Sequence, residues 1–493
     1  MTVPKLEVHD GRIGISNAFA RMPFRFGVVT MEAAASATLR LDVSVDGRPV
    51  SGYASDLLAY KWFDKRPEKT PADNVTDLLW VVGQALEVAR SLPAGSLFDH
   101  WRRLDAEVDR RSVAAGFNRL GASFGVSMVE RAMIDALGRA LGRPFFDLVR
   151  GGALGLEPES LFPELSGIPL ADVLPERPLE RVGLRHTVGL VDPIDADDLP
   201  PAERCCDGLP ETLAEYMEQD GLRYLKIKVG GDAAADLDRL ERIAALLSAM
   251  GREVSITLDG NEQYKRIDDF AALVDAIRSR GALQAFYRSI LFVEQPLERS
   301  VALAAPLDAT AMSVIGKPLL IDEADGWTSA YREAIGLGYR GVSHKNCKGV
   351  VRSLLNAMLA FERNRATASP GSYFQSAEDL TCLPVVSLQA DLAVVAALGI
   401  PHVERNGHHY FHGLDHLPRG EAEAALRAHP DLYRREGDGV VVAIDDGALD
   451  IRSLRTPGMG FACLPDLDAR TAAADWSFDS LNEIDAGRPA HGR

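Results

Sequence analysis

The sequence predicts an α/β protein that contains a (β/α)₈ barrel, and three observations support this fold class. From about residue 181, short β-rich runs alternate with helical stretches, which is typical of parallel βαβ units. Charged residues end successive strands about once every 30 residues, the size of one barrel unit. The length of 493 residues corresponds to about three average domains, or to two when one is a barrel of roughly 250 residues.

The first 150 residues predict an α+β domain. A strand is expected over 39–45, where leucine and valine alternate with polar residues, and Asp46-Gly47 then favours a hairpin turn. Three helices are expected, over 74–93, 96–112 and 127–141. The last helix is the clearest, because its apolar residues recur at helical spacing until Gly142 ends it.

The barrel is expected over 181–420. Its first six strands are the runs 183–190, 224–230, 254–260, 290–296, 318–324 and 339–346. Strands seven and eight are expected at 371–376 and 401–406, with a helix over 384–398 between them. An open doubly wound sheet is the alternative fold, but no G-x-G-x-x-G motif stands at a strand–helix junction.

Two further segments flank the barrel. Residues 151–180 are rich in proline and glycine and show no sustained period, so we expect a linker or a surface insertion there. In the C-terminal segment, 421–493, the strand–helix alternation stops, and the run 439–451 predicts a hairpin. We expect this segment to pack back on the first domain.

Composition excludes several classes of function. The 71 acidic residues outnumber the 54 basic ones, which gives a net charge of −17 and disfavours nucleic acid and anionic membranes as partners. The five cysteines form no C-x-x-C pair, which argues against a disulfide framework or a zinc site. The start lacks the features of a signal peptide, and the longest apolar run, 392–400, is too short to cross a bilayer. We therefore expect a cytoplasmic protein. We also expect a homo-oligomer.

The charged residues at the strand ends predict the site. They are Lys226 and Lys228, Asp259 with Asn261, Glu294, Asp322 with Glu323, and Lys345. In a barrel these positions meet at the mouth where active sites lie. Three carboxylates on consecutive strands suit Mg²⁺, which prefers oxygen ligands. Asp322 and Glu323 are adjacent, so only one of them can point inward while the strand persists. Each carboxylate alone would more often be a helix cap or a loop ion pair, and each lysine a solvated edge, but five strands that each supply such a residue favour the site.

In these motifs the chain resembles the enolase superfamily, in its muconate-lactonising-enzyme-like and mandelate racemase-like branch. The matching segments are KIK at 226–228, LDGN at 258–261, VEQP at 293–296, IDEA at 321–324, K-x-x-K-G at 345–349, RMPFRFG at 21–27, VERAMIDALGRALGRP at 129–144 and PGMG at 457–460. The resemblance implies a modified (β/α)₈ TIM barrel with an α+β N-terminal capping domain over residues 1–150. Extra length around 151–180, around 191–210 and after 465 departs from the family, as does His344 beside Lys345.

The resemblance also implies the roles of the site residues. Mg²⁺, with Mn²⁺ as an alternative, would be held by Asp259, Glu294 and Asp322, with Glu323 as the alternative third ligand. Lys228 and Lys345 would be bases on opposite faces of the substrate. The implied chemistry is abstraction of the proton next to a carboxylate of a small molecule. A metal ion at that carboxylate would stabilise the charge that develops.

This chemistry leaves the outcome of the reaction open. Two bases on opposite faces favour racemisation or epimerisation. A lyase (β-elimination or dehydration) or a cycloisomerase could use the same site, and a non-catalytic binding protein could retain the fold. The ammonium of Lys226 is expected to lower the pKa of the neighbouring base Lys228, because like charges disfavour protonation.

Further residues are candidates for binding the substrate. Arg25 lies in a segment that resembles the family's first lid loop and could bind a distal carboxylate. Asn261 shares a strand face with Asp259, and Glu404 and Asn406 share a face at the expected eighth strand. The three lysines and a divalent cation together predict an electropositive pocket. The histidines between 402 and 416 are expected to be structural.

Overall fold

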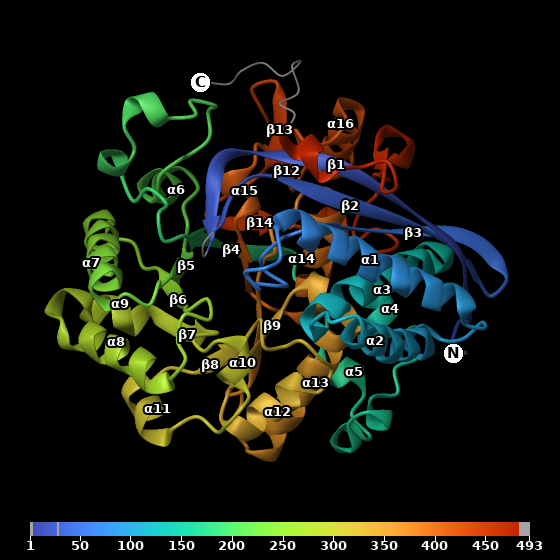
Figure 1. The fold of residues 1–493 in the computed structure, drawn as a ribbon, viewed down its shortest axis with the longest axis horizontal. Coiled ribbons are helices and arrows are strands. Elements are labelled where there is room, and N and C mark those ends of the chain that lie inside the picture. Colours follow the sequence, from blue (N-terminus) through green and yellow to red (C-terminus); the bar gives the residue numbers. More distant parts are fainter. Residues whose placement is uncertain (1–2, 27–28, 483–493) are drawn as a thin grey trace.

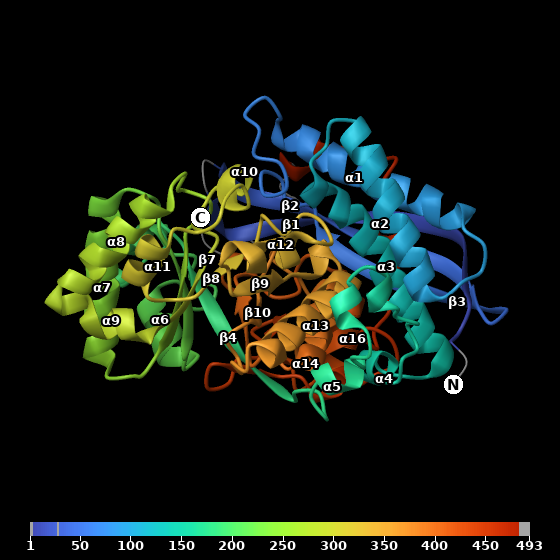
Figure 2. The ribbon, with the colours of Figure 1, turned by 90° about the horizontal axis from the view of Figure 1, so that it is seen from below.

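A closed ring of parallel strands, covered at one end by an antiparallel sheet, forms the core of the molecule (Figures 1 and 2). The computed structural model describes residues 3–26 and 29–482. The ring comprises β4 (Arg181–Val188), β5 (Tyr224–Lys228), β6 (Ser255–Asp259), β7 (Ile290–Glu294), β8 (Leu319–Ile321), β9 (Gly341–His344), β10 (Phe374–Ala377) and β11 (His402–Arg405). Neighbours in this order pair in parallel, and β11 pairs with β4 to close the ring. The predicted eight-stranded barrel is confirmed.

Helices follow the strands, and most of them cover the outside of the ring; the last two instead pack on the cap and on a two-stranded sheet after the barrel. They are α6 (Leu213–Gln219), α7 (Ala233–Met250), α8 (Ile267–Ser279), α9 (Gln284–Ser289), α10 (Arg299–Ala302), α11 (Ala309–Ile315), α12 (Ala330–Leu337), α13 (Val350–Ala366), α14 (Val386–Leu398), α15 (Gly407–Tyr410) and α16 (Arg419–Ala428). Helix α7 shows how the sequence sets their limits: Asp232 accepts from the first backbone N–H groups, and Gly251 ends the helix with a positive φ of 63°. Helix α14 is apolar all round because it packs against both barrel and cap elements.

The cap consists of three long strands and four helices at the N-terminus. The strands are β1 (Leu6–Phe26), β2 (Val29–Val45) and β3 (Arg48–Leu57), and the helices are α1 (Pro71–Ser91), α2 (Leu97–Ala114), α3 (Arg119–Leu141) and α4 (Phe145–Arg150). The predicted turn at Asp46-Gly47 joins β2 to β3, and both residues have positive φ. Helix α3 begins at Arg119, after its Asn118 cap, eight residues before the predicted start at 127. It is mostly buried, because it packs on β2 and β3 as well as on α1 and α2.

Two sequence expectations are wrong in detail. The segment expected to be a lid loop, 21–26, is the end of strand β1. The predicted hairpin at 439–451 does not form: β13 (Gly439–Val442) pairs with β12 (Tyr433–Glu436), whereas β14 (Ala448–Asp450) pairs antiparallel with β4 of the barrel. The β-propensity of the run was correctly recognised, but its pairing partners come from outside it.

The segments that flank the barrel contact both parts of the molecule. Helix α5 (Leu170–Val173), within 151–180, packs against α13. Further along, β15 (Thr471–Ala472) pairs with β1, and the backbone N–H of Met459 donates to Asp135 of α3 at 3.0 Å. None of the helices in the described ranges is both long and apolar enough to cross a membrane.

Several histidines form a buried cluster outside the barrel ring. His186 Nδ1 and His408 Nε2 lie 3.0 Å apart, and His409 Nδ1 lies 3.0 Å from the hydroxyl of Tyr216. Burial lowers the pKa of His186 and of His409 to about 3, because there is little water to solvate a charged ring. The cluster is held by hydrogen bonds and ring contacts, in line with the structural role expected for these histidines.

The contact between β3 and α3 gives a first prediction. A Cβ atom on Gly52 would lie 2.0 Å from the carbonyl oxygen of Ala132 in α3. We expect Gly52→Ala to destabilise the protein by about 3 kcal/mol or more, because neither backbone can yield. Gly83→Ala in α1 is the control, since its Cβ would meet nothing within 4 Å and should stabilise by about 0.5–1 kcal/mol. Equilibrium unfolding measures both, and equal effects would contradict the prediction.

The histidine cluster gives a prediction of pH dependence. The pKa of His186 is about 3 in the folded protein, against about 6.5 in an unfolded chain. Below pH 6.5 the unfolded chain therefore binds more protons, and stability falls as the pH falls towards 3. His186→Asn should reduce this slope by up to about 1 kcal/mol per pH unit. Unfolding measured between pH 7 and pH 4 tests this, and identical slopes in the two proteins would refute it.

Candidate active site

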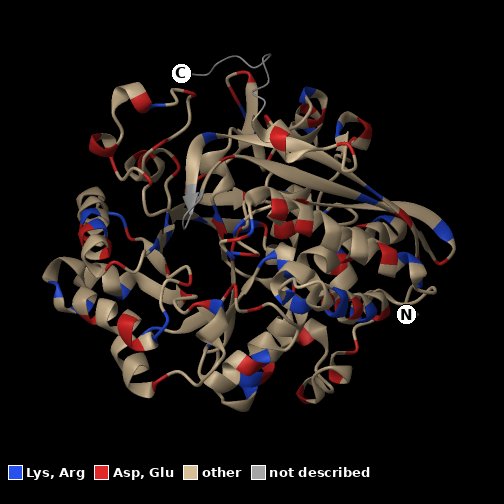
Figure 3. Ribbon diagram, in the orientation of Figure 1, with Lys and Arg blue, Asp and Glu red and all other residues tan. Residues whose placement is uncertain are grey.

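The cavity at the mouth of the barrel collects the charged side chains at the strand ends. It has a volume of about 540 Å³. Its barrel side is lined by Lys226, Lys228, Asp259, Asn261, Asp322, Glu323, Lys345, Asp379, Leu380, Thr381, Glu404 and Asn406. Its cap side is apolar and is lined by Phe24, Met31, Leu57, Ala59 and Trp62. The cap therefore closes the mouth with hydrophobic side chains, while the barrel supplies the charges. Figure 3 shows segments of both signs meeting near the centre of the ring.

The strand register explains why residues distant in sequence converge here. Lys228 of β5 is paired with Asp259 of β6, which in turn is paired with Glu294 of β7. These three residues form one row across neighbouring parallel strands. The next strand, β8, ends at Ile321, and Asp322 and Glu323 follow it directly.

Lys226 lies at the centre of the charged cluster and is almost completely buried. Its Nζ is 3.1 Å from Asp259 Oδ2, 2.8 Å from Glu294 Oε2, 3.1 Å from Glu378 Oε2 and 2.9 Å from Glu404 Oε2. Burial alone would lower the pKa of Lys226, but these carboxylates, Asp259 foremost, raise it well above its usual value. Lys226 is thus a fixed ammonium group.

Lys345 is held by Asp322 across 2.7 Å, and its Nζ lies 4.5 Å from the centre of the Trp62 ring. Burial opposes protonation of Lys345, yet the carboxylate of Asp322 outweighs it and raises the pKa of the lysine. A cation above an aromatic face is stabilised further. Lys345 must therefore be released from Asp322 before it can accept a proton.

Lys228 has a different environment. Its Nζ donates to Asn261 Oδ1 at 3.2 Å, and the backbone N–H of Asn261 donates to Asp259 Oδ1 at 2.8 Å. Asn261 has a φ of 45°, so the chain turns sharply after β6. The side-chain amide of Asn261 lies within hydrogen-bonding distance of Lys228. The amide of Asn261 thus orients Lys228.

Asp322 and Glu323 have different neighbours. Burial acts to raise the pKa of Asp322, but Lys345 and Lys348 hold it well below its usual value. Burial raises the pKa of Glu323 to about 7, with smaller contributions from Glu262 and Asp322. Glu323 lies beside the cap, where its Oε1 is 4.0 Å from Lys65 Nζ. Asp322, in contrast, lies near enough to Glu294 for its negative charge to help raise the pKa of Glu294.

The structure also places the predicted substrate-binding residues. Glu404 accepts from Lys226, from Thr187 Oγ1 at 2.7 Å and from the backbone N–H of Asp379 at 2.9 Å. Asn406 lines the same cavity, as does Asn261. The side chain of Arg25 lies outside the described residues.

Two acidic residues after β10 belong to the site and were not predicted. Glu378 is completely buried; it contacts Lys226, accepts from Ser376 Oγ at 2.6 Å and is ion-paired with Arg185 of β4. Asp379 accepts from the backbone N–H of Cys382 at 2.8 Å and lines the cavity. The signal was available, because Glu378 directly follows the seventh strand, as Asp322 follows the fifth.

The predicted electropositive pocket is wrong. Three lysines line the cavity, against the five carboxylates of Asp259, Asp322, Glu323, Asp379 and Glu404. A divalent cation would bring this lining to neutrality rather than to a positive charge. The expectation failed because three of these carboxylates were not counted in it.

The donor set of Asp259, Glu294 and Asp322 fits a hard divalent cation, since every donor is a buried carboxylate oxygen. Among the described residues no group of three or more His, Cys, Asp or Glu side chains has the spacing of a formed metal site. Lys226 bridges Asp259 and Glu294, and Lys345 pairs with Asp322.

Comparison with known proteins places the fold. A family model described as enolase C-terminal domain-like matches residues 208–462, more than half of the chain. The comparison with curated proteins gives no match.

Solved structures with similar folds include three enzymes. A dipeptide epimerase from Enterococcus faecalis V583, complexed with Mg and the dipeptide L-Leu-L-Tyr, has a TM-score of 0.59 and 15% identity, over 92% of this chain and 99% of that chain. An enolase from Bradyrhizobium, complexed with magnesium and mandelic acid, has a TM-score of 0.56 and 17% identity, over 94% and 96%. A muconate lactonizing enzyme from Pseudomonas fluorescens, complexed with muconolactone, has a TM-score of 0.56 and 14% identity, over 94% and 98%.

At these identities the solved structures establish the fold, and the family model establishes the membership. The barrel and the cap agree with the solved structures, which align with 92–94% of this chain, and the family model matches barrel residues. The chain belongs to the enolase C-terminal domain-like family, within the mandelate racemase/muconate lactonizing enzyme-like part of the enolase superfamily.

Proposed function

We propose that this protein removes the proton next to the carboxylate of a small-molecule substrate and returns a proton to the opposite face, as a racemase or epimerase. The observation that carries the proposal is the placement of Lys228 and Lys345. Lys228 ends β5 and Lys345 directly follows β9; these strands are four steps apart in a ring of eight, and both side chains line one cavity. A substrate between them would present one face to each lysine.

Asp259, Glu294 and Asp322 are proposed to hold Mg²⁺, with Mn²⁺ as a substitute. When bound, the ion would neutralise the negative charge that develops on the substrate carboxylate. The closeness of Asp322 to Glu294 supports Asp322 as the third ligand, because Glu323 lies towards Glu262 and Lys65.

The lysines then divide the work. Lys226, held as an ammonium by four carboxylates, is proposed to attract the substrate carboxylate and to stabilise the enediolate. Lys228, oriented by Asn261, takes or gives the proton on one face. Lys345 does the same on the other face once it has left Asp322. Each must be neutral when it accepts a proton.

The residues that line the cavity favour certain substrates over others. The apolar side chains of the cap favour an uncharged, hydrophobic substituent on the reacting carbon. Elimination or cycloisomerisation would pass through the same enediolate but would need only one base. The presence of two opposed lysines is what favours racemisation or epimerisation over these alternatives, and over a non-catalytic binding role.

Removing each base should have opposite stereochemical effects. In D₂O with Mg²⁺, we expect Lys228→Ala to slow exchange of the α-proton of one enantiomer by about 10²–10⁴-fold, and Lys345→Ala to slow that of the other. Both variants should lose racemisation. The enantiomers of N-acetyl amino acids, dipeptides and mandelate, followed by NMR, provide the assay, and the exposed Lys265→Ala serves as control. Wild-type exchange rates in Lys228→Ala with both enantiomers would disprove its role.

The two candidate third ligands can be separated by metal binding. Asp322→Asn should weaken Mn²⁺ binding by about 100-fold or more, since a lost ligand should cost at least as much as a lost outer partner. Glu323→Gln should change the affinity by less than about threefold, because Glu323 lies on the cap side. Titration followed by electron paramagnetic resonance measures both, and the reverse order would assign the metal to Glu323.

A further inference from the structure

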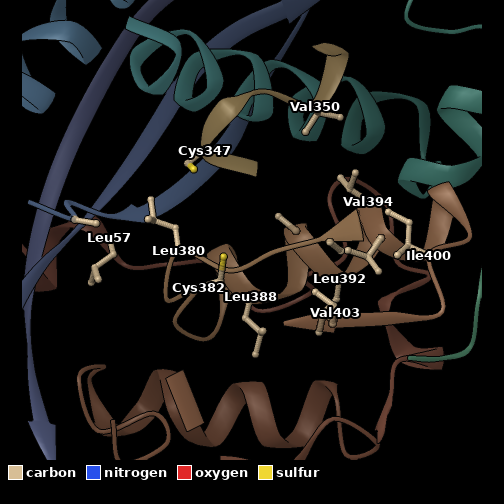
Figure 4. Packing of buried hydrophobic residues seen from close by; sticks show 14 of the residues in the cluster. Leu57, Cys347, Val350, Leu380, Cys382, Leu388, Leu392, Val394, Ile400 and Val403 are labelled. Carbon is tan, nitrogen blue, oxygen red and sulfur yellow. The ribbon is translucent and has the colours of Figure 1, made fainter. Parts of the chain in front are cut away.

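Glu130 is a residue of the cap whose carboxylate binds the backbone of the barrel. It lies on α3, is completely buried, and its Oε1 accepts the backbone N–H groups of Val350 and of Val351, the latter at 3.1 Å. These are the first two residues of α13. The first N–H groups of a helix have no acceptor within the helix, so Glu130 supplies one from another part of the molecule. Figure 4 shows Val350 against α3.

The segment that Glu130 holds carries the second base. Lys345 follows β9 directly, a single 3₁₀ turn over Asn346–Lys348 comes next, and Gly349 leads into α13. Gly349 has a φ of 116°, a conformation that side-chain-bearing residues rarely adopt. With only four residues between Lys345 and Val350, a fixed start of α13 restricts where Lys345 can lie.

The first turn of α13 is also hydrogen-bonded to β9. Ser353 Oγ lies 2.7 Å from Nδ1 of His344, the residue before Lys345. The backbone around Lys345 is therefore held from the barrel side by Ser353 and from the cap side by Glu130. Lys228, in contrast, stands on β5 across the ring, and its hydrogen bond goes to Asn261 of the barrel.

We infer that Glu130 is a positioning residue for Lys345. By fixing the start of α13, Glu130 makes the position of Lys345 depend on the contact between the cap and the barrel. The inference rests on the proposed function, because it concerns one base of that reaction. It assigns no contact between Glu130 and substrate. Loss of Glu130 should impair the Lys345 face of the reaction and leave the Lys228 face nearly intact.

A matched control lies on the same helix. Asp135 is also a completely buried carboxylate of α3, and it accepts backbone N–H groups of Tyr53 and Met459, both at 3.0 Å. It has no hydrogen bond to the segment 345–351. Asp135→Asn therefore removes a comparable buried charge from the cap, and it reports the effect of general destabilisation.

The first measurement needs no substrate. Amide hydrogen exchange of peptides covering 345–355, followed by mass spectrometry, compares Glu130→Met, Glu130→Gln and Asp135→Asn with the wild-type protein. Glu130→Met removes both acceptor oxygens, whereas Glu130→Gln keeps a carbonyl oxygen that can accept the N–H groups of Val350 and Val351. We expect exchange to accelerate in this segment at least about tenfold in Glu130→Met, as for a lost hydrogen bond, and not in Glu130→Gln or Asp135→Asn.

The second measurement follows α-proton exchange of N-acetyl-D-phenylalanine and N-acetyl-L-phenylalanine in D₂O with Mg²⁺. Glu130→Met should slow exchange by about 10–100-fold for the enantiomer that Lys345→Ala impairs, and less than about twofold for the other. Glu130→Gln, which keeps the acceptor oxygen, should stay close to the wild-type rates. Asp135→Asn should affect both enantiomers equally or neither.

Three results would overturn the inference: unchanged hydrogen exchange of 345–355 in Glu130→Met, equal acceleration in Asp135→Asn, or equal slowing of both enantiomers in Glu130→Met. A failure of the proposed function would look different. The wild-type protein itself would then exchange no α-proton of the tested carboxylates, while the hydrogen-exchange comparison would still decide whether Glu130 fixes the segment.

Discussion

The buried ammonium group of Lys226 is the constraint on which the barrel mouth depends. A charge removed from water costs several kcal/mol unless it is closely paired, and Lys226 is paired with carboxylates from β6, β7, β11 and the turn after β10. These acids could not all be buried as carboxylates so close together without a cation between them. The lysine therefore holds carboxylates from four parts of the ring together at the cavity that the substrate would enter.

The remaining charges of the mouth are arranged around that centre. Glu378 also pairs with Arg185 on β4, and Asp322 pairs with Lys345 and Lys348 after β9, so the ion-pair network extends to both sides of the mouth. Polar groups in such a network hold one another in place, so a change at one member alters the others. The cap contributes no charge to the lining among its described residues and instead excludes water with aromatic and aliphatic side chains. Charge and hydrophobic cover thus come from different parts of the chain.

Much of this arrangement could be predicted from the sequence. The alternation of strands and helices predicted all eight barrel strands, because each unit is local in sequence and repeats. Asp259 and Glu294 were recognisable because each ends a clear apolar run, and Lys345 because it comes about one barrel unit after Asp322. Glu378 was missed because its strand, FQSA, is short and partly polar. The pairing of β14 with β4 and the early start of α3 depend on contacts between distant segments, which no local pattern encodes.

The pairing of β15 with β1 has a consequence for the order in which the molecule can be completed during synthesis. Gly14 lies opposite Ala472. β1 can therefore form this pairing only after β15 has been synthesised, some 450 residues later. Met459 likewise reaches α3 only after the entire barrel has been made. Until then the backbone of Gly14 and Ile15 lacks this pairing, and an unpaired strand edge is a site where chains can associate wrongly. The segment after the barrel thus completes the pairing of β1 at this point.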